Sequence, residues 1–483
     1  MNKPLRHVSV AALVLFVLLL ANINYVQVVE APHLQARPGN TRTLLESYAR
    51  PRGQIVVDGK AVARSKKTND QLKYVRVYKH GPRYAHATGY YTFLHGSAGI
   101  ERAEDSLLSG KDDRLFVRRV INLFQGGKPR GATVQLTLDA GAQKAAFEGL
   151  RGHRGAAVAI DPQTGAILAM ASSPSYNPNK IAGHNNKKVN KAWKRISSDP
   201  DQPLLNRALD QRYPPGSTFK LVTSAAALSS GKYTPQTQIP APTTYTLPQT
   251  STTLQNFGGE VCSSTGSMSL EEALTISCNT AFAKLGVKLG DDALRKQAQK
   301  FGFGDDFQVP MDTAESVFPS NPNPPQTAIS AIGQYEVATT PLQMAMISAA
   351  IANSGVVMKP HLVKEVEGPD TKPIEGAQPE RYGRAVSPKV ADELTQMMRS
   401  VVENGTGASA QIPGTTVAGK TGTAQHGEGA APHAWFTSFA PADNPQVAVA
   451  VIVEDGGSLG SEATGGAVAA PIARAMMQAV IHQ

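Results

Sequence analysis

Three short strings that together could build an acyl-transfer site constrain this chain more than any other feature. They are Ser217-Thr218-Phe219-Lys220, Ser277-Cys278-Asn279 and Lys420-Thr421-Gly422, in that order along the second half of the sequence. The first offers a nucleophile with a base one helical turn away, the second a hydroxyl that can relay a proton, and the third a cation beside a strand. Acyl transfer through a serine ester needs all of these in one pocket, so the fold must bring distant segments together.

Ser217 and Lys220 are predicted to share one face at the start of a helix. Tyr213-Pro214-Pro215-Gly216 precedes the serine and an apolar run over Phe219–Leu228 follows, which is typical of a helix start. Lys220 can accept the serine proton only if burial, the helix dipole and a second cation lower its pKa. A helix cap beside a solvated lysine is the alternative. Ser229-Ser230-Gly231-Lys232 has the same spacing, but it falls where the helix should end.

The second string is predicted to lie inside a helical stretch over Leu274–Leu289. There the Ser277 hydroxyl could return a proton to a leaving amine, and the Asn279 amide could hold a substrate carbonyl. Ser175-Tyr176-Asn177 also fits the pattern, but prolines flank it and indicate a loop. The context therefore favours Ser277.

The third string, extended to Thr423, follows a predicted strand at Val417-Ala418-Gly419. Gly422 permits close backbone approach, and the amides of a strand edge can pair with an extended peptide. Lys420 could hold an anionic end group and also help to keep Lys220 neutral. A simple strand terminus is the alternative interpretation.

The N-terminus predicts a membrane anchor. Lys3 and Arg6 precede an uncharged stretch from Val8 to Val29, which reaches the roughly 20 residues that a bilayer requires. Positive residues before the apolar run predict a cytoplasmic N-terminus. A cleaved signal peptide is the alternative, but no small-x-small cleavage site follows. We therefore expect a single-pass protein of the cell membrane with an extracytoplasmic catalytic domain.

The chain has only two cysteines, Cys262 and Cys278, and whether they can form a disulfide depends on the compartment in which they lie. An oxidising compartment permits a disulfide between them, and closing a loop of that size stabilises a fold by about 3 kcal/mol. Two separate buried thiols are the alternative.

The length of 483 residues suggests two or three domains. We expect a cytoplasmic tip and transmembrane anchor over residues 1–30, a small β-rich, non-catalytic pedestal domain over 31–130 that begins with a linker at Pro32–Asn40, and a catalytic domain over 131–483. The pattern of elements predicts an α+β fold, in which helices flank an antiparallel sheet and a helical subdomain is inserted.

The periodicity of apolar residues predicts individual elements as well. Strand pairs are expected over Gln54–Ala63 and Gly155–Ser172, and a strand with a following helix at Val134–Leu150. Further helices are predicted at Phe219–Leu228, Leu270–Leu289, Pro341–Ala352, Lys389–Val402 and Ala467–His482, and strands at Ala434–Ala440 and Gln446–Glu454.

Several function classes are disfavoured by the sequence. The net charge of +10 is spread out without a run of five basic residues or a nucleic-acid reader motif, so we expect no nucleic-acid partner. His80, His86 and His95 are scattered, and no His-Glu-x-x-His string occurs. His426, Glu428 and His433 are expected at a solvated hairpin tip. We expect neither a metal nor a cofactor.

The chain resembles a class B penicillin-binding protein over essentially its whole length, and its small N-terminal region is similar to the actinobacterial penicillin-binding protein A type. Beyond the three strings, the resemblance rests on Arg52-Gly53-Gln54-Ile55, Gly99-Ile100-Glu101, Asn206-Arg207-Ala208, Gly333-Gln334, Thr340-Pro341-Leu342-Gln343, Asn404-Gly405-Thr406-Gly407 and Ala434-Trp435-Phe436. Cys278 inside the second string departs from the usual pattern. No Glu-x-x-Leu-Asn string, which would resemble the deacylating loop of class A β-lactamases, is present.

The resemblance implies a peptidoglycan D,D-transpeptidase. In that family Ser217 would attack a D-Ala-D-Ala stem peptide with Lys220 as base, and Ser277 with Lys420 would return a proton to the departing D-Ala. Asn279 would position the substrate amide, Thr421 and Thr423 would bind the carboxylate, and the backbone N–H groups of Ser217 and Thr423 would form the oxyanion hole.

The resemblance also implies partners. β-Lactams would acylate the serine, and a polytopic membrane glycosyltransferase with division or elongation proteins would be the protein partners. The alternatives are a D,D-carboxypeptidase, a β-lactamase, or a non-catalytic β-lactam sensor or scaffold.

Overall fold

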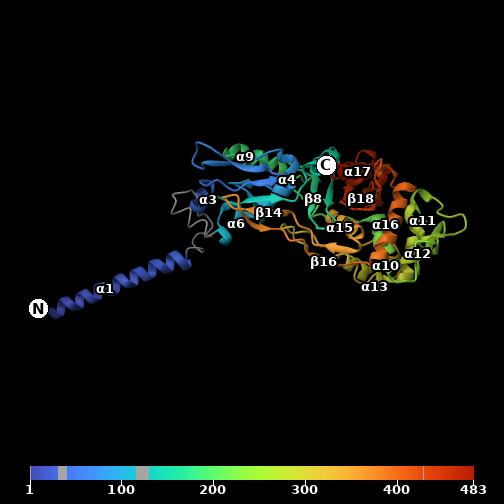
Figure 1. The fold of residues 1–483 in the computed structure, drawn as a ribbon, viewed down its shortest axis with the longest axis horizontal. Helices are drawn as coiled ribbons and strands as arrows, with labels where there is room; N and C mark the ends of the chain where they lie inside the picture. The colour runs from blue at the N-terminus through green and yellow to red at the C-terminus, as the bar shows by residue number, and fades with distance from the viewer. Residues whose placement is uncertain (1, 31–40, 116–129, 428, 483) are drawn as a thin grey trace.

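The structure is a computed structural model that describes residues 2–30, 41–115, 130–427 and 429–482. Helix α1 (Asn2–Asn24) stands apart from the folded body (Figure 1) and continues into a π-helical segment, η1 (Tyr25–Glu30). The span Lys3–Glu30 has 28 residues, its most apolar 18-residue window has a mean hydropathy of 2.2, and none of that window is buried. It is long and apolar enough to cross a membrane, which agrees with the predicted anchor helix. The predicted linker at Pro32–Asn40 lies outside the described residues.

The catalytic half is built around a five-stranded antiparallel sheet in the order β17-β18-β19-β7-β8. Its strands are β7 (Gly155–Ile160), β8 (Ile167–Ser173), β17 (Ala418–Ala424), β18 (His433–Ala440) and β19 (Val447–Val453). Every residue of β19 is buried because helices cover both faces. Its odd-numbered valines pack toward α8 (Ala140–Gly149) and α17 (Ala470–Ile481), and the alternate residues face α15 (Pro341–Ala352). β17, which contains the third string, forms an edge of this sheet, so its outer side has no partner strand.

A helical subdomain lies beside this edge, as the right half of Figure 1 shows. It contains α10 (Lys220–Ser229), α11 (Leu270–Thr275), α12 (Asn279–Leu289), α13 (Asp291–Lys300), α14 (Pro324–Ser330) and α16 (Pro388–Glu403). Short strand pairs connect these helices: β9 (Gln238–Pro240) with β12 (Ser267–Ser269), β10 (Thr244–Thr246) with β11 (Thr253–Gln255), and β13 (Val356–Met358) with β16 (Arg381–Arg384). The predicted α+β fold with an inserted helical subdomain is confirmed.

One helix prediction is wrong. The expected helix over Leu270–Leu289 is two helices, because α11 ends at Thr275 and α12 begins at Asn279. Ser277 lies in the break with a φ of 62°, a left-handed conformation that a helix cannot contain. The apolar periodicity continues through the break, so periodicity alone could not reveal it.

The N-terminal half contains a six-stranded sheet in the order β15-β14-β6-β1-β2-β3. The strands are β1 (Ile55–Val57), β2 (Lys60–Lys67), β3 (Tyr74–Tyr78), β6 (Thr133–Leu136), β14 (Val363–Glu367) and β15 (Pro373–Gly376). The predicted strand pair with its turn at Asp58 is confirmed as β1 and β2. Because β14 and β15 come from far downstream, this sheet crosses the division predicted at residue 131. That division stays a prediction.

Short helices complete the N-terminal half. They are α3 (Thr41–Tyr48), α4 (Gly81–Thr88), α5 (Ile100–Ala103) and α6 (Asp105–Ser109), with a small β4 (Tyr91–Thr92) and β5 (Gly96–Ser97) pair and the surface helix α9 (Asn186–Ser197). Glu101 is completely buried and bonds the guanidinium groups of Arg52 and Arg76 at 2.6 Å and 2.5 Å. A buried carboxylate needs such cationic partners, so this cluster ties α5 to the sheet.

Candidate active site

Ser217 is held in a short 3₁₀ turn, Gly216–Phe219, immediately before α10. Gly216 has a φ of 53°, and a Cβ there would lie 2.7 Å from the carbonyl oxygen of Thr423, so only glycine fits. Its N–H donates to the carbonyl of Gly333 at 2.9 Å, and the Trp435 indole donates to Pro214 O at 3.0 Å. These contacts press the serine segment against β17. Within the described part of the chain the Ser217 hydroxyl has no hydrogen-bond partner, which leaves it free for a substrate.

Lys220 is completely buried on the first turn of α10. Burial, and then the charge of Lys420, hold the pKa of its amine well below the usual range. Its Nζ donates to the Ser277 carbonyl at 2.7 Å and to Asn279 Oδ1 at 2.8 Å. A neutral amine has two N–H donors and one lone pair. With both donors used by these acceptors, the lone pair can accept a hydroxyl proton.

Ser277 connects the two lysines. Lys420 Nζ donates to Ser277 Oγ at 2.8 Å and to Thr421 O at 3.0 Å, while Lys220 Nζ lies 3.3 Å from the same hydroxyl. Lys420 is also completely buried, and burial lowers the pKa of its amine to about 7. One hydroxyl between two amines of different proton affinity can relay a proton in either direction.

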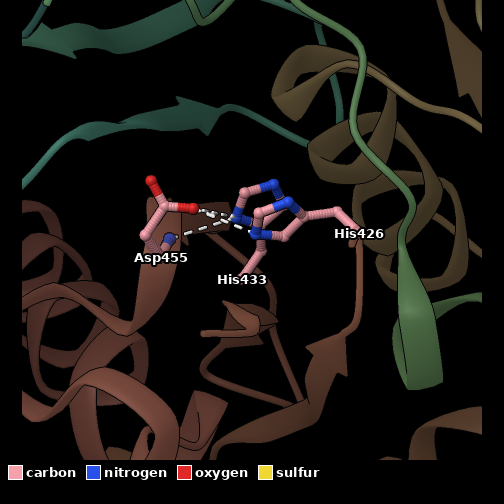
Figure 2. Close-up of side chains that lie close together, drawn as sticks. All are labelled: His426, His433 and Asp455. Atoms are coloured by element: carbon pink, nitrogen blue, oxygen red, sulfur yellow. Dashed lines mark hydrogen bonds and ion pairs between the residues drawn. The ribbon is translucent and has the colours of Figure 1, made fainter. Parts of the chain in front are cut away.

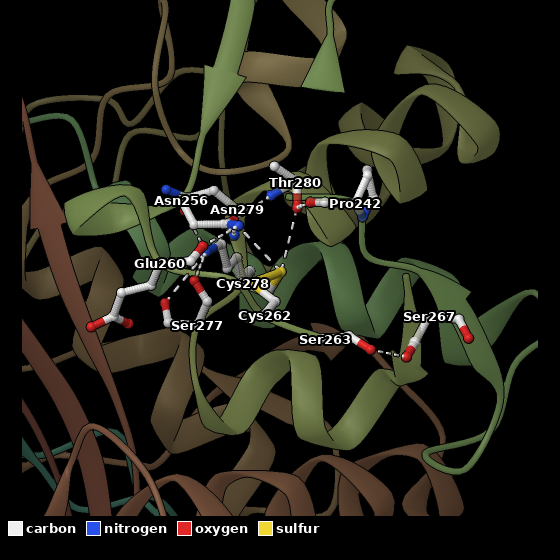
Figure 3. The surroundings of a disulfide bond; sticks show 11 residues. Pro242, Asn256, Glu260, Cys262, Ser263, Ser267, Ser277, Cys278, Asn279 and Thr280 are labelled. Atoms are coloured by element: carbon white, nitrogen blue, oxygen red, sulfur yellow. Dashed lines mark hydrogen bonds between the residues drawn. A yellow bond between two sulfur atoms is a disulfide. The ribbon is translucent and has the colours of Figure 1, made fainter. Parts of the chain in front are cut away.

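Asn256 holds the second string in place, and sequence reasoning missed it. Its Oδ1 accepts from the N–H groups of Asn279 and Thr280, both at 3.0 Å, and so caps α12. Cys278, in the same break, forms a disulfide with Cys262, with Cα atoms 5.9 Å apart (Figure 3). The loop from Asn256 to Cys262 is thus fixed at both ends. An asparagine 23 residues before Asn279 gives no local signal of this role.

The third string lies in the middle of β17, where Gly422 faces the nucleophile segment. A Cβ at Gly422 would lie 2.9 Å from Thr218 Cγ2 and 3.0 Å from Pro215 O. The missing side chain therefore lets the strand pack directly on the serine turn. The hydroxyl groups of Thr421 and Thr406 share a hydrogen bond of 2.6 Å.

These groups surround one cavity of about 300 Å³. It is lined by Ser217, Asn256, Phe257, Glu260, Val261, Cys262, Ile276, Ser277, Cys278, Asn279, Thr406, Thr421, Thr423, Thr464 and Gly466. Of the catalytic and substrate-binding residues expected from the sequence, five line it directly, namely Ser217, Ser277, Asn279, Thr421 and Thr423. Lys220 and Lys420 do not line the cavity but contact the Ser277 hydroxyl, which does. Gly422 packs against the segment that carries Ser217. Thr406 also lines the cavity and belongs to the Asn404–Gly407 string noted in the sequence without a role, whereas the sequence did not single out Thr464.

A buried ion pair fixes the segment that precedes the nucleophile. Glu454 accepts from the Arg207 guanidinium at 2.8 Å and from the Tyr213 hydroxyl at 2.6 Å. Burial opposes the Glu454 charge, but these two donors together with Arg154 hold the pKa of its carboxyl below the usual range. Glu454, which directly follows β19, is thereby bonded to two residues of the segment that leads to Ser217, Arg207 and Tyr213.

His426, His433 and Asp455 form a separate cluster at the β17–β18 turn (Figure 2). The imidazole rings stack with centroids 3.8 Å apart and an interplanar angle of 9°. His433 is buried rather than solvated, burial lowers its pKa to about 4, and its Nδ1 accepts from the Asp455 N–H at 3.1 Å. These contacts hold the turn between β17 and β18 against the segment that follows β19, and the three candidate ligand atoms lie within 4.8 Å of one another. Glu428 lies outside the described residues.

Comparison with known proteins shows the family. Residues 155–478 match the model of the penicillin-binding protein transpeptidase domain, and residues 52–134 match that of the penicillin-binding protein A dimerisation domain. The chain belongs to the penicillin-binding protein transpeptidase family. The predicted resemblance is therefore confirmed.

Two mycobacterial relatives of this penicillin-binding protein align along its whole length. The peptidoglycan D,D-transpeptidase PbpA of Mycolicibacterium smegmatis is 46% identical over 100% of both chains. PbpA of Mycobacterium tuberculosis is 44% identical over 100% of this chain and 99% of its own.

Solved structures of penicillin-binding protein A from M. tuberculosis share the fold. Its ceftriaxone acyl-enzyme complex has a TM-score of 0.88 at 43% identity and covers 90% of this chain and 100% of its own. Its penicillin G acyl-enzyme complex has a TM-score of 0.85 at 44% identity, over 89% and 99% of the two chains.

Proposed function

We propose that this protein is a serine D,D-transpeptidase that cross-links peptidoglycan stem peptides and that β-lactams acylate. The observation that carries the proposal is the buried pair of lysines joined through Ser277 beside a free Ser217 hydroxyl. The relatives named as peptidoglycan D,D-transpeptidases and as β-lactam acyl-enzymes support it.

In the acylation half, Ser217 Oγ attacks the carbonyl carbon of the penultimate D-Ala and its proton passes to the Lys220 amine. The backbone N–H groups of Ser217 and Thr423 stabilise the oxyanion. The C–N bond then breaks, and Ser277 hands the departing D-Ala amine a proton that Lys420 or Lys220 replaces. Asn279 holds the substrate amide, and Thr421 and Thr423 with Lys420 hold the terminal carboxylate.

In the second half, the amine of another stem peptide attacks the ester carbonyl. It forms the new C–N bond, loses a proton to the lysine–serine relay, and Ser217 leaves as a hydroxyl. The proposal includes an extracytoplasmic catalytic domain and a division of the chain at residues 30 and 130. It also includes a polytopic membrane glycosyltransferase and division or elongation proteins as partners.

The test is covalent labelling of the full chain by a fluorescent penicillin. Ser217→Ala is expected to abolish the label, because it removes the hydroxyl that is proposed to attack the β-lactam. Ser229→Ala is the matched control, since Ser229 begins the second copy of the same spacing but is exposed; it should label normally. Labelling of Ser217→Ala would refute the proposed nucleophile, and rapid loss of label from the wild type would favour a β-lactamase.

A further inference from the structure

Helix α9 concentrates positive charge on the outside of the N-terminal half (Figure 1). Its sequence contains no acid and five cations, all of them exposed: Lys187, Lys188, Lys191, Lys194 and Arg195. The net charge of the whole chain is +10, so a charge equal to half of that excess lies on this one helix. A solvated helix ordinarily mixes charges of both signs. The composition of α9 therefore calls for an anionic ligand.

The apolar side of α9 is used up by packing within the protein. Trp193 and Ile196 belong to one apolar cluster with Tyr176, and Trp193 also stacks on His95 with ring centroids 4.3 Å apart. At about 3.6 residues per turn, the five cations occupy roughly a third of the circumference, opposite these side chains. None of the apolar residues of α9 is exposed. The basic side thus points outward, without apolar groups that could insert into a bilayer.

These cations have no partner in the described parts of the chain. Neither their side chains nor that of Lys180, in the neighbouring η3 (Pro178–Lys180), form an ion pair or a hydrogen bond there. On α13, by contrast, Arg295 is paired with Asp291 and Asp292. Like charges three or four positions apart repel on a helix, so a bound anion would stabilise α9. We refer to the six cations as the basic face: Lys180, Lys187, Lys188, Lys191, Lys194 and Arg195.

The basic face is fixed against the N-terminal sheet. His184 Nδ1 lies 2.6 Å from Asp70 Oδ2, which joins the β2–β3 turn to the start of α9. Asn179 in η3 accepts from the Tyr78 N–H at 2.9 Å and donates to the Tyr78 carbonyl at 2.8 Å, on β3. The β2–β3 hairpin adds further exposed cations: Lys66, Lys67 and Lys73. The positive surface therefore extends from α9 to the hairpin on a fixed backbone.

The lysines of α9 form a row. Lys187, Lys191 and Lys194 are four and three positions apart, so they follow the helix axis in steps of about 6 Å and about 4.5 Å. We propose that this row binds a linear polymer of phosphodiester groups in the cell envelope. Successive phosphates would lie along the helix, and each ammonium would bind one as a point charge. The inference goes beyond the proposed function, because none of the six cations lines the active-site cavity.

Lysine acetylation of the full chain in phosphatidylcholine nanodiscs tests the face directly. The chain is treated briefly with an acetylating reagent, with and without saturating poly(glycerol phosphate), and each lysine is read by mass spectrometry. Polymer should slow acetylation of Lys187, Lys191 and Lys194 at least about fivefold, because an ammonium paired with phosphate is shielded. Lys296 and Lys300 are the controls, since both are exposed on α13 and have no ion pair in the described residues. Equal slowing on the two helices, or none on α9, would overturn the proposal.

A charge-matched pair of variants measures the contribution of the row. Fluorescein-labelled poly(glycerol phosphate) is titrated with the full chain at several salt concentrations, and binding is followed by anisotropy. Replacing all three lysines of the row by glutamine should lower the slope of log Kd against log salt by about 2, since a flexible polyanion releases about 0.7 counterions per phosphate contact. The control replaces three exposed lysines elsewhere by glutamine, and it should keep the wild-type slope: Lys144, Lys296 and Lys300. The same slope for both variants contradicts the assignment to α9.

A lipid surface is the competing ligand, and the acetylation experiment distinguishes it. Nanodiscs of phosphatidylglycerol without polymer should leave the lysines of α9 as reactive as phosphatidylcholine nanodiscs do. If anionic lipid alone protects them, the face binds the membrane and the polymer proposal is wrong. Penicillin acylation of the triple variant should proceed at the wild-type rate, which shows that it is folded and separates this inference from the proposed function. The acetylation experiment uses the wild type, so it decides the proposal even where the variant misfolds.

Discussion

Asn256→Ala is the sharpest test of how the second string is positioned. The substitution removes the one acceptor for the N–H groups of Asn279 and Thr280 and the donor to the Glu260 carbonyl. Asn279 in turn accepts from the proposed base Lys220 at 2.8 Å. Asn256 has no hydrogen bond to Lys220 or Ser217 in the described residues, yet it fixes the backbone of Asn279 and Thr280 at the start of α12.

The expected cost follows from these contacts. Loss of a helix N-cap destabilises a protein by about 1 kcal/mol, and leaving buried N–H groups unpaired adds about 1–3 kcal/mol. We therefore expect a loss of about 2–4 kcal/mol in the free energy of unfolding. Displacement of reacting groups by about 1 Å can cost about 100-fold in rate, so acylation should slow by about 10–100-fold.

The assay is the second-order rate constant for acylation by fluorescent penicillin, measured beside urea unfolding. Asn323→Ala is the matched control, because Asn323 also caps a helix, α14, through a bond of 3.0 Å to Gln326 N, outside the active-site cavity. It should lose about 1 kcal/mol of stability and keep the wild-type rate of acylation. The reasoning fails if Asn256→Ala is destabilised but acylates normally, or if both variants slow alike.

Two further outcomes follow from the same site. Gly422→Ala should slow penicillin acylation by at least about 10-fold, because its Cβ would meet Pro215 and Thr218 within 3.0 Å and displace β17 from the serine turn. Gly383→Ala is the control and should acylate normally, because a Cβ there meets nothing within 4 Å. Equal rates for the two variants would contradict the packing argument. The pH profile of acylation should fall above about pH 7, because burial lowers the pKa of Lys420 to about 7 and the cation that holds the substrate carboxylate is lost as pH rises. It should also fall in acid as Lys220 gains a proton, since its pKa is lowered by burial and by Lys420; a rate that keeps rising through pH 8–9 would refute this assignment of charge.

Local patterns in the sequence predicted many of the helices and strands and the types of residue in the candidate site. The helix at Pro341–Ala352 and the strand pair at Gly155–Ser172 follow from apolar periodicity, which depends on near neighbours in the chain. The spacing of Ser217 and Lys220 likewise requires only one turn of helix. These features are predictable because the residues that create them are three to seven positions apart.

Contacts between distant segments decided the rest. The break at Ser277 depends on Asn256 and Cys262, which reach it from a separate loop, and the N-terminal sheet gains β14 and β15 from beyond residue 360. The sequence alone determined which residue types could perform acyl transfer and in what order they occur. Only the tertiary structure decided that Lys220 is buried beside Lys420, which lowers its pKa, and that Asn256 lies at the cavity, because burial and charge effects arise when those segments pack together.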